Sequence, residues 1–267
     1  MAATAATWWT LERHGSVAVA TFDRPPRNFM SFAAMGELEQ LVVAVAQDED
    51  IRVLVLTGGV PGYFVAHADL DDLAQLGRGE PVGGDPLAWS RTFDLLARMP
   101  QPVVAAVGGQ AWGGGCELAM ACTMRVAAAS AHFAQPEVAV GIIPGAGGTQ
   151  RLPRLVGPGR AAELLFSGRV VPADEALRIG LVEAVLLDDG FVTAAVEWAQ
   201  AIATRPPRAV AAAKRAMVEG NELPLGEGLA VEGRLFVECQ MGPEAVALER
   251  AASARYDEAG PDERVEL

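Results

Sequence analysis

The sequence has few of the residues that bind metal ions or form cross-links. Among 267 residues there are three cysteines and three histidines. They are Cys116, Cys122 and Cys239, and His14, His67 and His132. No cysteine pair has metal-ligand spacing, and an odd, sparse set suits thiols buried in a reducing compartment. Three histidines also argue against a site built from several imidazoles. We therefore predict no metal site.

Positive charge is also scarce. The chain carries 34 acidic and 21 basic residues, a net charge of -13, and Lys214 is its only lysine. An excess of negative charge disfavours the phosphate backbone of nucleic acids and anionic membrane surfaces. We expect neither nucleic acid nor membrane as a partner.

Long apolar runs of the kind that target or anchor a chain are missing too. The N-terminal stretch MAATAATWWTLERHG has no basic segment and reaches Glu12 before any apolar stretch of signal length. The span from Met99 to Cys116 is uncharged, but it contains two prolines and five glycines. Such a span is not a membrane helix. The pattern predicts a cytoplasmic protein.

Segments with the period of strands and helices alternate in the first half of the chain. Ser16–Phe22 and Arg52–Thr57 are rich in β-branched residues, and between them Ser31 precedes a helical pattern that ends near Gln47. Strand, helix and strand at this spacing predict parallel α/β structure. Further strands are expected at 102–107, 124–128 and 181–186, helices at 69–76 and 87–98, and loops at 77–86 and 133–148.

Helical patterns dominate the chain after Thr149. We expect a boundary near residue 190 between an α/β core and a helical region. The expected helices are 149–156, 158–167, 172–178, 189–204, 206–219, 223–240 and 242–257.

The stretch AWGGGCELAMAC, Ala111–Cys122, is the most suggestive for chemistry. Three glycines precede a short helical pattern that we expect to begin near Gly114. A ligand can approach a backbone without side chains, and the free N–H groups of a helix start suit an oxygen that gains negative charge. Glu117 lies one turn further on. A tightly packed helix start with Glu117 as a dipole partner is an equally good interpretation of these residues alone.

Several motifs give the chain a resemblance to the enoyl-CoA hydratase (crotonase) family over nearly its whole length. The most specific is QPEVAVGIIPGAGGTQRLPRLVG, Gln135–Gly157, with GGGCELA at its proper distance upstream. The other matching segments are Arg24–Asn28, Val65–Leu70, Gln101–Cys122, Ala131–Gly157 and Glu227–Glu232.

The resemblance implies a fold, an assembly and a substrate. The expected fold is an α/β crotonase-like spiral of ββα units (1–190) that binds acyl-CoA, followed by a C-terminal helical region (191–267) that mediates oligomerisation. The family forms homotrimers, often paired into hexamers. Its substrate is an acyl-CoA thioester, and no further cofactor is expected.

The resemblance also assigns roles in the site. The backbone N–H groups of Ala68 and Gly114 would form an oxyanion hole for the thioester carbonyl. Glu117 and Glu137 would be the catalytic pair: Glu117 mainly takes a proton from water, and Glu137 mainly supplies the proton to C2. The implied reaction is hydration of a trans-2-enoyl-CoA to a 3-hydroxyacyl-CoA.

Other residues are expected to contact substrate. Arg27 is the best candidate for the CoA phosphates. The remaining expected contacts are Ala66, His67, Asp69, Leu70, Trp112, Gly113, Pro136 and Gly145. His67 stands where the family usually has glycine, so it either borders the thioester or points away. If the position requires a positive φ, histidine there costs about 1 kcal/mol.

Four residues have structural alternatives. Asp69 is better explained as a helix N-cap, Trp112 as a packed core aromatic and Cys116 as a buried thiol. Thr123 replaces the family's usual aspartate, which we interpret as a structural difference. The C-terminal segment 241–256 departs from the family's basic ending, which leaves phosphate contacts there open.

Two alternative functions remain. An enoyl-CoA isomerase would need only one acid–base group, and Glu117 argues against it. A non-catalytic acyl-CoA-binding subunit is suggested by His67 and the unusual C-terminal segment.

Overall fold

The computed structural model describes residues 7–259, so the first six residues of the stretch used to predict localisation lie outside it. Contacts divide the chain into two compact units, Met1–Arg205 and Pro206–Leu267. The first unit is mixed α/β, as the alternating periods predict.

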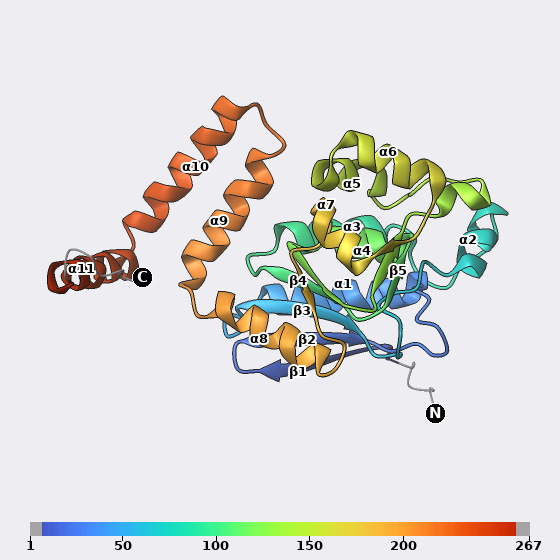
Figure 1. Ribbon diagram of the computed structural model, residues 1–267, viewed down its shortest axis with the longest axis horizontal. Coiled ribbons are helices and arrows are strands. Elements are labelled where there is room, and N and C mark those ends of the chain that lie inside the picture. The colour runs from blue at the N-terminus through green and yellow to red at the C-terminus, as the bar shows by residue number, and fades with distance from the viewer. Residues whose placement is uncertain (1–6, 260–267) are drawn as a thin grey trace. The chain divides into compact units, whose positions relative to one another are not determined.

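A six-stranded sheet forms the centre of the first unit within the described residues, in the order β1-β2-β3-β4-β6-β9 (Figure 1). The pairs from β2 to β9 are parallel, whereas β1 pairs with β2 antiparallel. The strands are β1 (Trp9–His14), β2 (Val17–Phe22), β3 (Val53–Gly58), β4 (Val103–Val107), β6 (Met124–Ala128) and β9 (Ala184–Leu186). Strand β4 is apolar throughout, and β3 is apolar except for Thr57, because helices cover both faces of the sheet. The sequence did not predict β1, and β9 is shorter than the expected 181–186.

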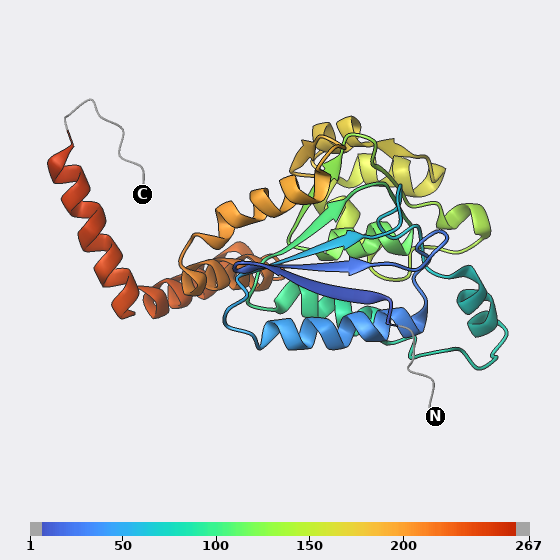
Figure 2. The ribbon, with the colours of Figure 1, turned by 90° about the horizontal axis from the view of Figure 1, so that it is seen from below.

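Helices α1 (Phe32–Ala46) and α3 (Ala88–Arg98) cover one face of the sheet (Figure 2). Ser31 caps α1 as predicted, because its side chain accepts from the Ala34 N–H. Helix α8 (Phe191–Ala203) packs on the other face, against β2, β3 and β4. Its buried face includes Phe191 and Ala199. The helical unit therefore begins at Pro206, later than the predicted boundary near residue 190.

A second group of elements packs beside the main sheet and contributes residues to the site. It contains the small sheet β5 (Gln110–Trp112), β7 (His132–Ala134) and β8 (Val171–Pro172), together with α4 (Gly114–Ala121), which is buried along its whole length. The other elements are α2 (Leu70–Gly77), η1 (Glu137–Val140), α5 (Gly148–Val156), α6 (Pro158–Ser167) and α7 (Ala173–Ile179). Segment 133–148, expected to be largely loop, also contains the end of β7 and the 3₁₀ helix η1.

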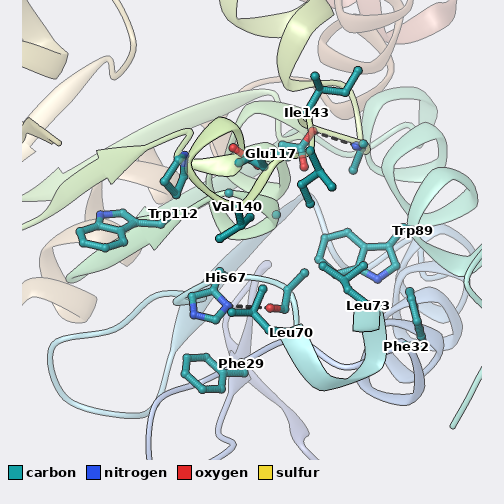
Figure 3. Close-up of a pocket in the computed structure, with 18 of the residues that line it drawn as sticks. Phe29, Phe32, His67, Leu70, Leu73, Trp89, Trp112, Glu117, Val140 and Ile143 are labelled. Carbon is teal, nitrogen blue, oxygen red and sulfur yellow. Dashed lines mark hydrogen bonds between the residues drawn. The ribbon is translucent and has the colours of Figure 1, made fainter. Parts of the chain in front are cut away.

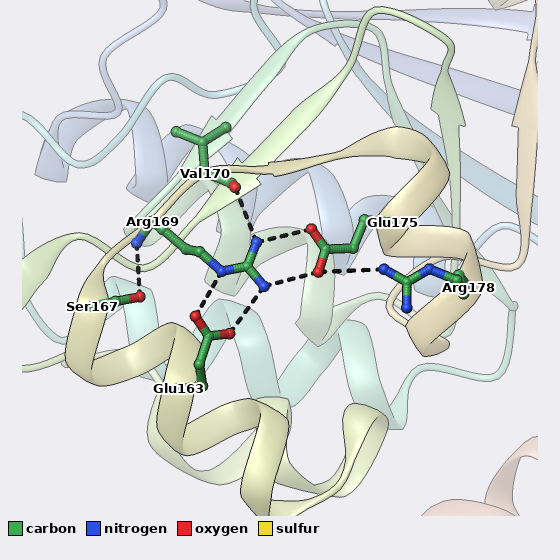
Figure 4. A network of polar contacts seen from close by, with 6 residues as sticks. All are labelled: Glu163, Ser167, Arg169, Val170, Glu175 and Arg178. Carbon is green, nitrogen blue, oxygen red and sulfur yellow. Dashed lines mark hydrogen bonds and ion pairs between the residues drawn. The ribbon is translucent and has the colours of Figure 1, made fainter.

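An ion-pair network joins α6 to α7 through the segment between them (Figure 4). The Arg169 guanidinium donates to Glu163 at 2.7 Å and to Glu175 at 2.8 Å, and Arg178 approaches Glu175 at 3.7 Å. The fork geometry of arginine allows both bidentate pairs, so the segment that carries β8 is held at two points.

The second unit consists of helices α9 (Pro207–Gly220), α10 (Leu225–Gln240) and α11 (Pro243–Glu258). Gly220 and Gly228 let α9 and α10 approach closely, since an added Cβ on Gly228 would lie 3.3 Å from the Gly220 carbonyl oxygen. Between residues 7 and 259, no helix combines the length and apolar character needed to cross a membrane.

Asn28 connects the end of β2 to the segment that enters the site. It is fully buried with φ at 52°, and its side-chain amide donates to the carbonyls of Phe22 and Phe64 at 2.9 and 3.0 Å. Its side-chain oxygen accepts from the Arg24 N–H at 2.7 Å, and its carbonyl accepts from the Ala66 N–H at 3.1 Å. One side chain thereby anchors the start of the 66–69 segment.

We expect Asn28→Ala to lower the free energy of unfolding by about 2–4 kcal/mol, because it removes three side-chain hydrogen bonds, two of them buried, and alanine disfavours a positive φ. Urea denaturation followed by circular dichroism measures the change. Asn28→Gly loses the same hydrogen bonds without the φ cost, so it should be less destabilised. Equal stability of Asn28→Ala and the unmodified protein would contradict this role.

Candidate active site

A cavity of about 600 Å³ lies at the N-terminal end of α4 (Figure 3). Its lining combines a mainly apolar surface with two glutamates. The lining residues are Arg27, Phe29, Phe32, Tyr63, His67, Ala68, Leu70, Leu73, Leu76, Pro86, Trp89, Gln110, Trp112, Gly113, Gly114, Glu117, Pro136, Glu137, Ala139, Val140, Ile142, Ile143, Gly145 and Ala146.

Glu117 is the more buried of the two acids. It lies in the first turn of α4 and is 3% exposed. Its Oε1 accepts from the backbone N–H groups of Ala146 at 2.8 Å and Gly148 at 2.7 Å. Burial raises the pKa of Glu117, while these two donors and the charge of Arg151 oppose that rise. Because both amides bind Oε1, the other oxygen is available to a ligand.

Glu137 opens the 3₁₀ helix η1 and lies over the glycine run. Its Oε1 is 3.1 Å from where a Cβ on Gly113 would stand, and its buried Oε2 has no hydrogen-bond partner among the described residues. Burial raises the pKa of Glu137 to about 7, and the charge of Glu117 adds to the effect. A carboxyl group with this pKa can give or take a proton near neutral pH.

Two backbone amides that line the cavity donate to no described residue. The Met30 N–H donates to the His67 carbonyl, and the Asp69 N–H donates to the Met30 carbonyl. The N–H of Ala68, between these two residues in the sequence, therefore points away from Met30. Gly114 is the first residue of α4, where an N–H has no partner within the helix. The two residues are neighbours, since a Cβ on Gly114 would lie 3.3 Å from the Ala68 Cβ.

His67 faces the cavity without backbone strain. Asn28 is the only non-glycine residue with positive φ in the described chain, so the position of His67 does not require glycine for its φ. The imidazole stacks on Phe29 with ring centroids 4.2 Å apart, and Nδ1 donates to the Ala68 carbonyl at 2.6 Å. His67 thus contacts the loop that presents the Ala68 amide.

The rest of the cavity is formed by apolar side chains. Leu70, Leu73 and Leu76 lie three residues apart on α2, a helix with no buried residue of its own. Val140, Ile142 and Ile143 belong to the segment after Glu137, and all three are exposed. Trp89 packs against the start of α4, with its ring 2.7 Å from where a Cβ on Gly114 would stand. An apolar ligand could be covered on several sides here.

Most of the residues predicted from the sequence line this one cavity. Ala66 and Asp69 do not. The Ala66 N–H donates to the Asn28 carbonyl, and the Ala66 carbonyl accepts from the Trp112 N–H. Asp69 caps α2 and forms an ion pair with Arg24 at 2.7 Å. The residues that do line it are Arg27, His67, Ala68, Leu70, Trp112, Gly113, Gly114, Glu117, Pro136, Glu137 and Gly145.

Cys116 and Trp112 illustrate the structural alternatives. Burial raises the pKa of the Cys116 thiol to about 12, which suits an inert buried thiol. Trp112 lines the cavity, and its indole N–H donates to His132 at 3.0 Å. Within residues 7–259, no three His, Cys, Asp or Glu side chains are grouped so as to hold a metal ion.

The sequence analysis missed Trp89 and Arg151, together with the amides of Ala146 and Gly148. The glycine-rich PGAGG turn directly before a helix was a usable signal, because such a turn offers free N–H groups to a carboxylate. Trp89 and Phe93 lie one turn apart on α3. That spacing indicated that both pack in the interior, but not which element they pack against.

Comparison with known proteins places the chain among acyl-CoA enzymes. The family model for enoyl-CoA hydratase/isomerase matches residues 12–249. A short-chain-enoyl-CoA hydratase from Clostridium acetobutylicum is 40% identical over 232 residues, 86% of this chain and 88% of that protein. A crotonyl-CoA hydratase from Syntrophomonas wolfei is 40% identical over 230 residues, 86% of this chain and 88% of that protein.

Solved structures agree. The crystal structure of an enoyl-CoA hydratase from Bacillus anthracis superposes with a TM-score of 0.85 at 35% identity, covering 93% of this chain and 96% of that one. The predicted resemblance and the α/β crotonase-like fold are confirmed by these matches.

Glu137→Gln should stabilise the folded protein at high pH. The unfolded carboxyl ionises near pH 4.5, whereas the folded one stays protonated to about pH 7. The folded state binds more protons in this window, so stability falls as pH rises through it. Glutamine removes this loss, and we expect a gain on the order of 1–2 kcal/mol at pH 8 after allowance for solvent screening. Urea denaturation at pH 4.5 and pH 8 measures it.

The exposed Glu49 gives a matched control, since Glu49→Gln removes the same charge at the surface. It should change stability little at either pH. A Glu137→Gln variant that gains no stability between pH 4.5 and pH 8, relative to the unmodified protein, would rule out the perturbed carboxyl.

Proposed function

Because this chain belongs to the enoyl-CoA hydratase/isomerase family, we propose that it is an enoyl-CoA hydratase that adds water to a trans-2-enoyl-CoA to give a 3-hydroxyacyl-CoA. The observation that carries the proposal is a pair of glutamates, the buried Glu117 and the half-buried Glu137, in one apolar cavity. Beside them lie two backbone N–H groups that donate to no other described residue. Hydration requires one group that removes a proton from water and another that supplies a proton to carbon.

The amides of Ala68 and Gly114 would bind the thioester oxygen. As water attacks C3, the electrons of the double bond move through C2 onto that oxygen, which gains negative charge. Fixed N–H donors stabilise this charge without reorientation, and one such donor is typically worth about 3–4 kcal/mol of barrier. That neither amide donates to another residue in the described part of the chain supports this role.

Glu117 would act mainly as base and Glu137 mainly as acid. The amides of Ala146 and Gly148 bind Oε1 of Glu117, which leaves Oε2 for the attacking water. Water forms its bond to C3 as its proton passes to Glu117, and C2 takes the proton of Glu137. The coupled pair titrates as a unit, so its single proton returns to Glu137 before the next cycle.

The apolar walls would hold the acyl chain. Side chains from α2, the 140–143 segment and Trp89 surround the cavity with hydrocarbon. The two relatives named for short-chain and crotonyl substrates favour a short acyl group here too. Arg27 is exposed at the cavity and is our candidate for the CoA phosphates. No cofactor besides the CoA thioester is proposed.

The main alternative is an isomerase that moves the double bond. It needs one acid–base group, so the presence of a second glutamate in the cavity favours hydration. A product assay that separates 3-hydroxyacyl-CoA from shifted enoyl-CoA distinguishes them. A non-catalytic acyl-CoA binder would show no exchange of the C2 proton in heavy water.

We also propose that the helical region mediates a homotrimer or hexamer and that the protein is cytoplasmic. Large apolar side chains on α10 that are more than half exposed support an interface between subunits. They are Leu225, Leu229 and Phe236.

Replacement of either glutamate by glutamine should reduce kcat for hydration of crotonyl-CoA by about 10²–10⁴-fold, because each variant loses one proton-transfer group. KM should change little, since the oxyanion donors and apolar walls remain. Steady-state kinetics measure both, and circular dichroism verifies the fold. Turnover near the unmodified rate in Glu137→Gln would refute the mechanism.

The pH profile of kcat/KM for hydration should be bell-shaped. The base Glu117 must be ionised and the acid Glu137 protonated, so activity rises as Glu117, whose pKa is raised, loses its proton and declines above about pH 7 as Glu137 ionises. Initial rates at limiting crotonyl-CoA measure the profile, and Glu49→Gln should retain it. A profile that stays flat from pH 7 to pH 9 would contradict the assignment of Glu137.

A further inference from the structure

Arg151 is a half-buried cation behind the catalytic pair. It lies in the first turn of α5, and its guanidinium lies over the Phe93 ring, 5.6 Å from the centroid. Its Nη1 donates to the Ala146 carbonyl at 2.8 Å. Arg151 does not line the cavity, so it would not contact substrate.

The turn that Arg151 binds is the turn that holds Glu117. The same Ala146 residue accepts from Arg151 through its carbonyl and donates to Glu117 Oε1 through its N–H. Gly147 adopts φ 109°, and a Cβ on it would lie 2.0 Å from Arg151 Nη1. Turn, guanidinium and carboxylate are therefore packed as one unit, in which displacement of Arg151 would shift a donor of Glu117.

Charge links the two side chains as well. Arg151 lowers the pKa of Glu117, against the larger effect of burial. The other titratable groups that act here are Glu137 on η1 and Cys116 on α4 near Glu117, and Asp94 on α3 and Cys122 on α4 near Arg151. Asp94 already pairs with Arg98 at 2.7 Å, so it offsets Arg151 only in part.

We propose that Arg151 is a positioning residue for the hydration proposed above: it holds the 145–148 turn against Glu117 and supplies positive charge that favours the ionised form of this carboxylate. Its position behind the turn, with no access to the cavity, separates this role from substrate binding.

Three variants separate charge from hydrogen bonding. Arg151→Gln can still donate to the Ala146 carbonyl but has no charge. Arg151→Lys keeps the charge but replaces the forked guanidinium by a single ammonium group. Arg154→Gln is the control, because Arg154 lies on the same helix, is exposed and bonds only Gln150 among residues 7–259. Thermal melting first establishes that each variant is folded.

The first measurement does not depend on turnover. The carboxyl stretch of Glu117, identified by its loss in Glu117→Gln, is titrated by infrared difference spectroscopy. In Arg151→Gln the midpoint should move up by about one pH unit, because an opposite charge is lost. It should move little in Arg151→Lys and not at all in Arg154→Gln. An unchanged midpoint in a folded Arg151→Gln overturns the proposal.

The second measurement is the pH profile of hydration. The acidic limb of kcat/KM should move up with the infrared midpoint, and kcat at pH 6 should fall about tenfold with KM nearly unchanged. Arg151→Lys should retain most of the kcat that Arg151→Gln loses at pH 6. If Arg151→Gln lowers only the melting temperature and both limbs of the kcat/KM profile stay in place, Arg151 has a purely structural role and the proposal is overturned. If the unmodified protein does not hydrate crotonyl-CoA but the midpoint still moves, the proposed function fails and the role of Arg151 stands.

Discussion

The close approach of the α4 N-terminus to the 65–68 segment is the constraint on which the site depends. A Cβ on Gly115 would lie 1.9 Å from the Val65 carbonyl oxygen, so only glycine lets the two backbones meet. This contact brings the Gly114 amide beside Ala68 and positions Glu117 one turn deeper. Oxyanion donors and base are thus presented by one rigid helix start, which matches the need for fixed donors in charge stabilisation.

The two acids are buried in different ways, and the difference matches the roles we propose. Glu117 receives two backbone donors and the charge of Arg151, which favour its ionised form. Glu137 has a buried oxygen that no described residue hydrogen-bonds, and burial raises its pKa to about 7. Such a group costs stability in the absence of substrate, as active-site groups commonly do.

Much of the fold was predictable because apolar period and capping are local properties. The parallel strands, the Ser31 cap and most helix ends agree with the sequence analysis. The exceptions have tertiary causes. Strand β1 has two charged residues among its six and is held in the sheet by pairing with β2, while η1 is one short turn within an irregular segment. Helix α8 joins the core because Phe191 and Ala199 pack on the sheet, which no local signal at residue 190 could indicate.

The sequence alone determined which residue types are available for chemistry, namely carboxylates and glycines with no pattern of metal ligands. It also contained the motifs that resemble a known family. It could not show that Glu117 and Glu137, twenty positions apart, share one cavity. Pairing of β5 with β7 decided this, since it aligns Trp112 with Ala134 and so brings the residues that follow each strand together. Tertiary structure also decided which oxygen of Glu117 is free and that Arg151 lies behind the turn that binds the other oxygen. The direction of backbone N–H groups and the burial of side chains are set only when distant segments pack together.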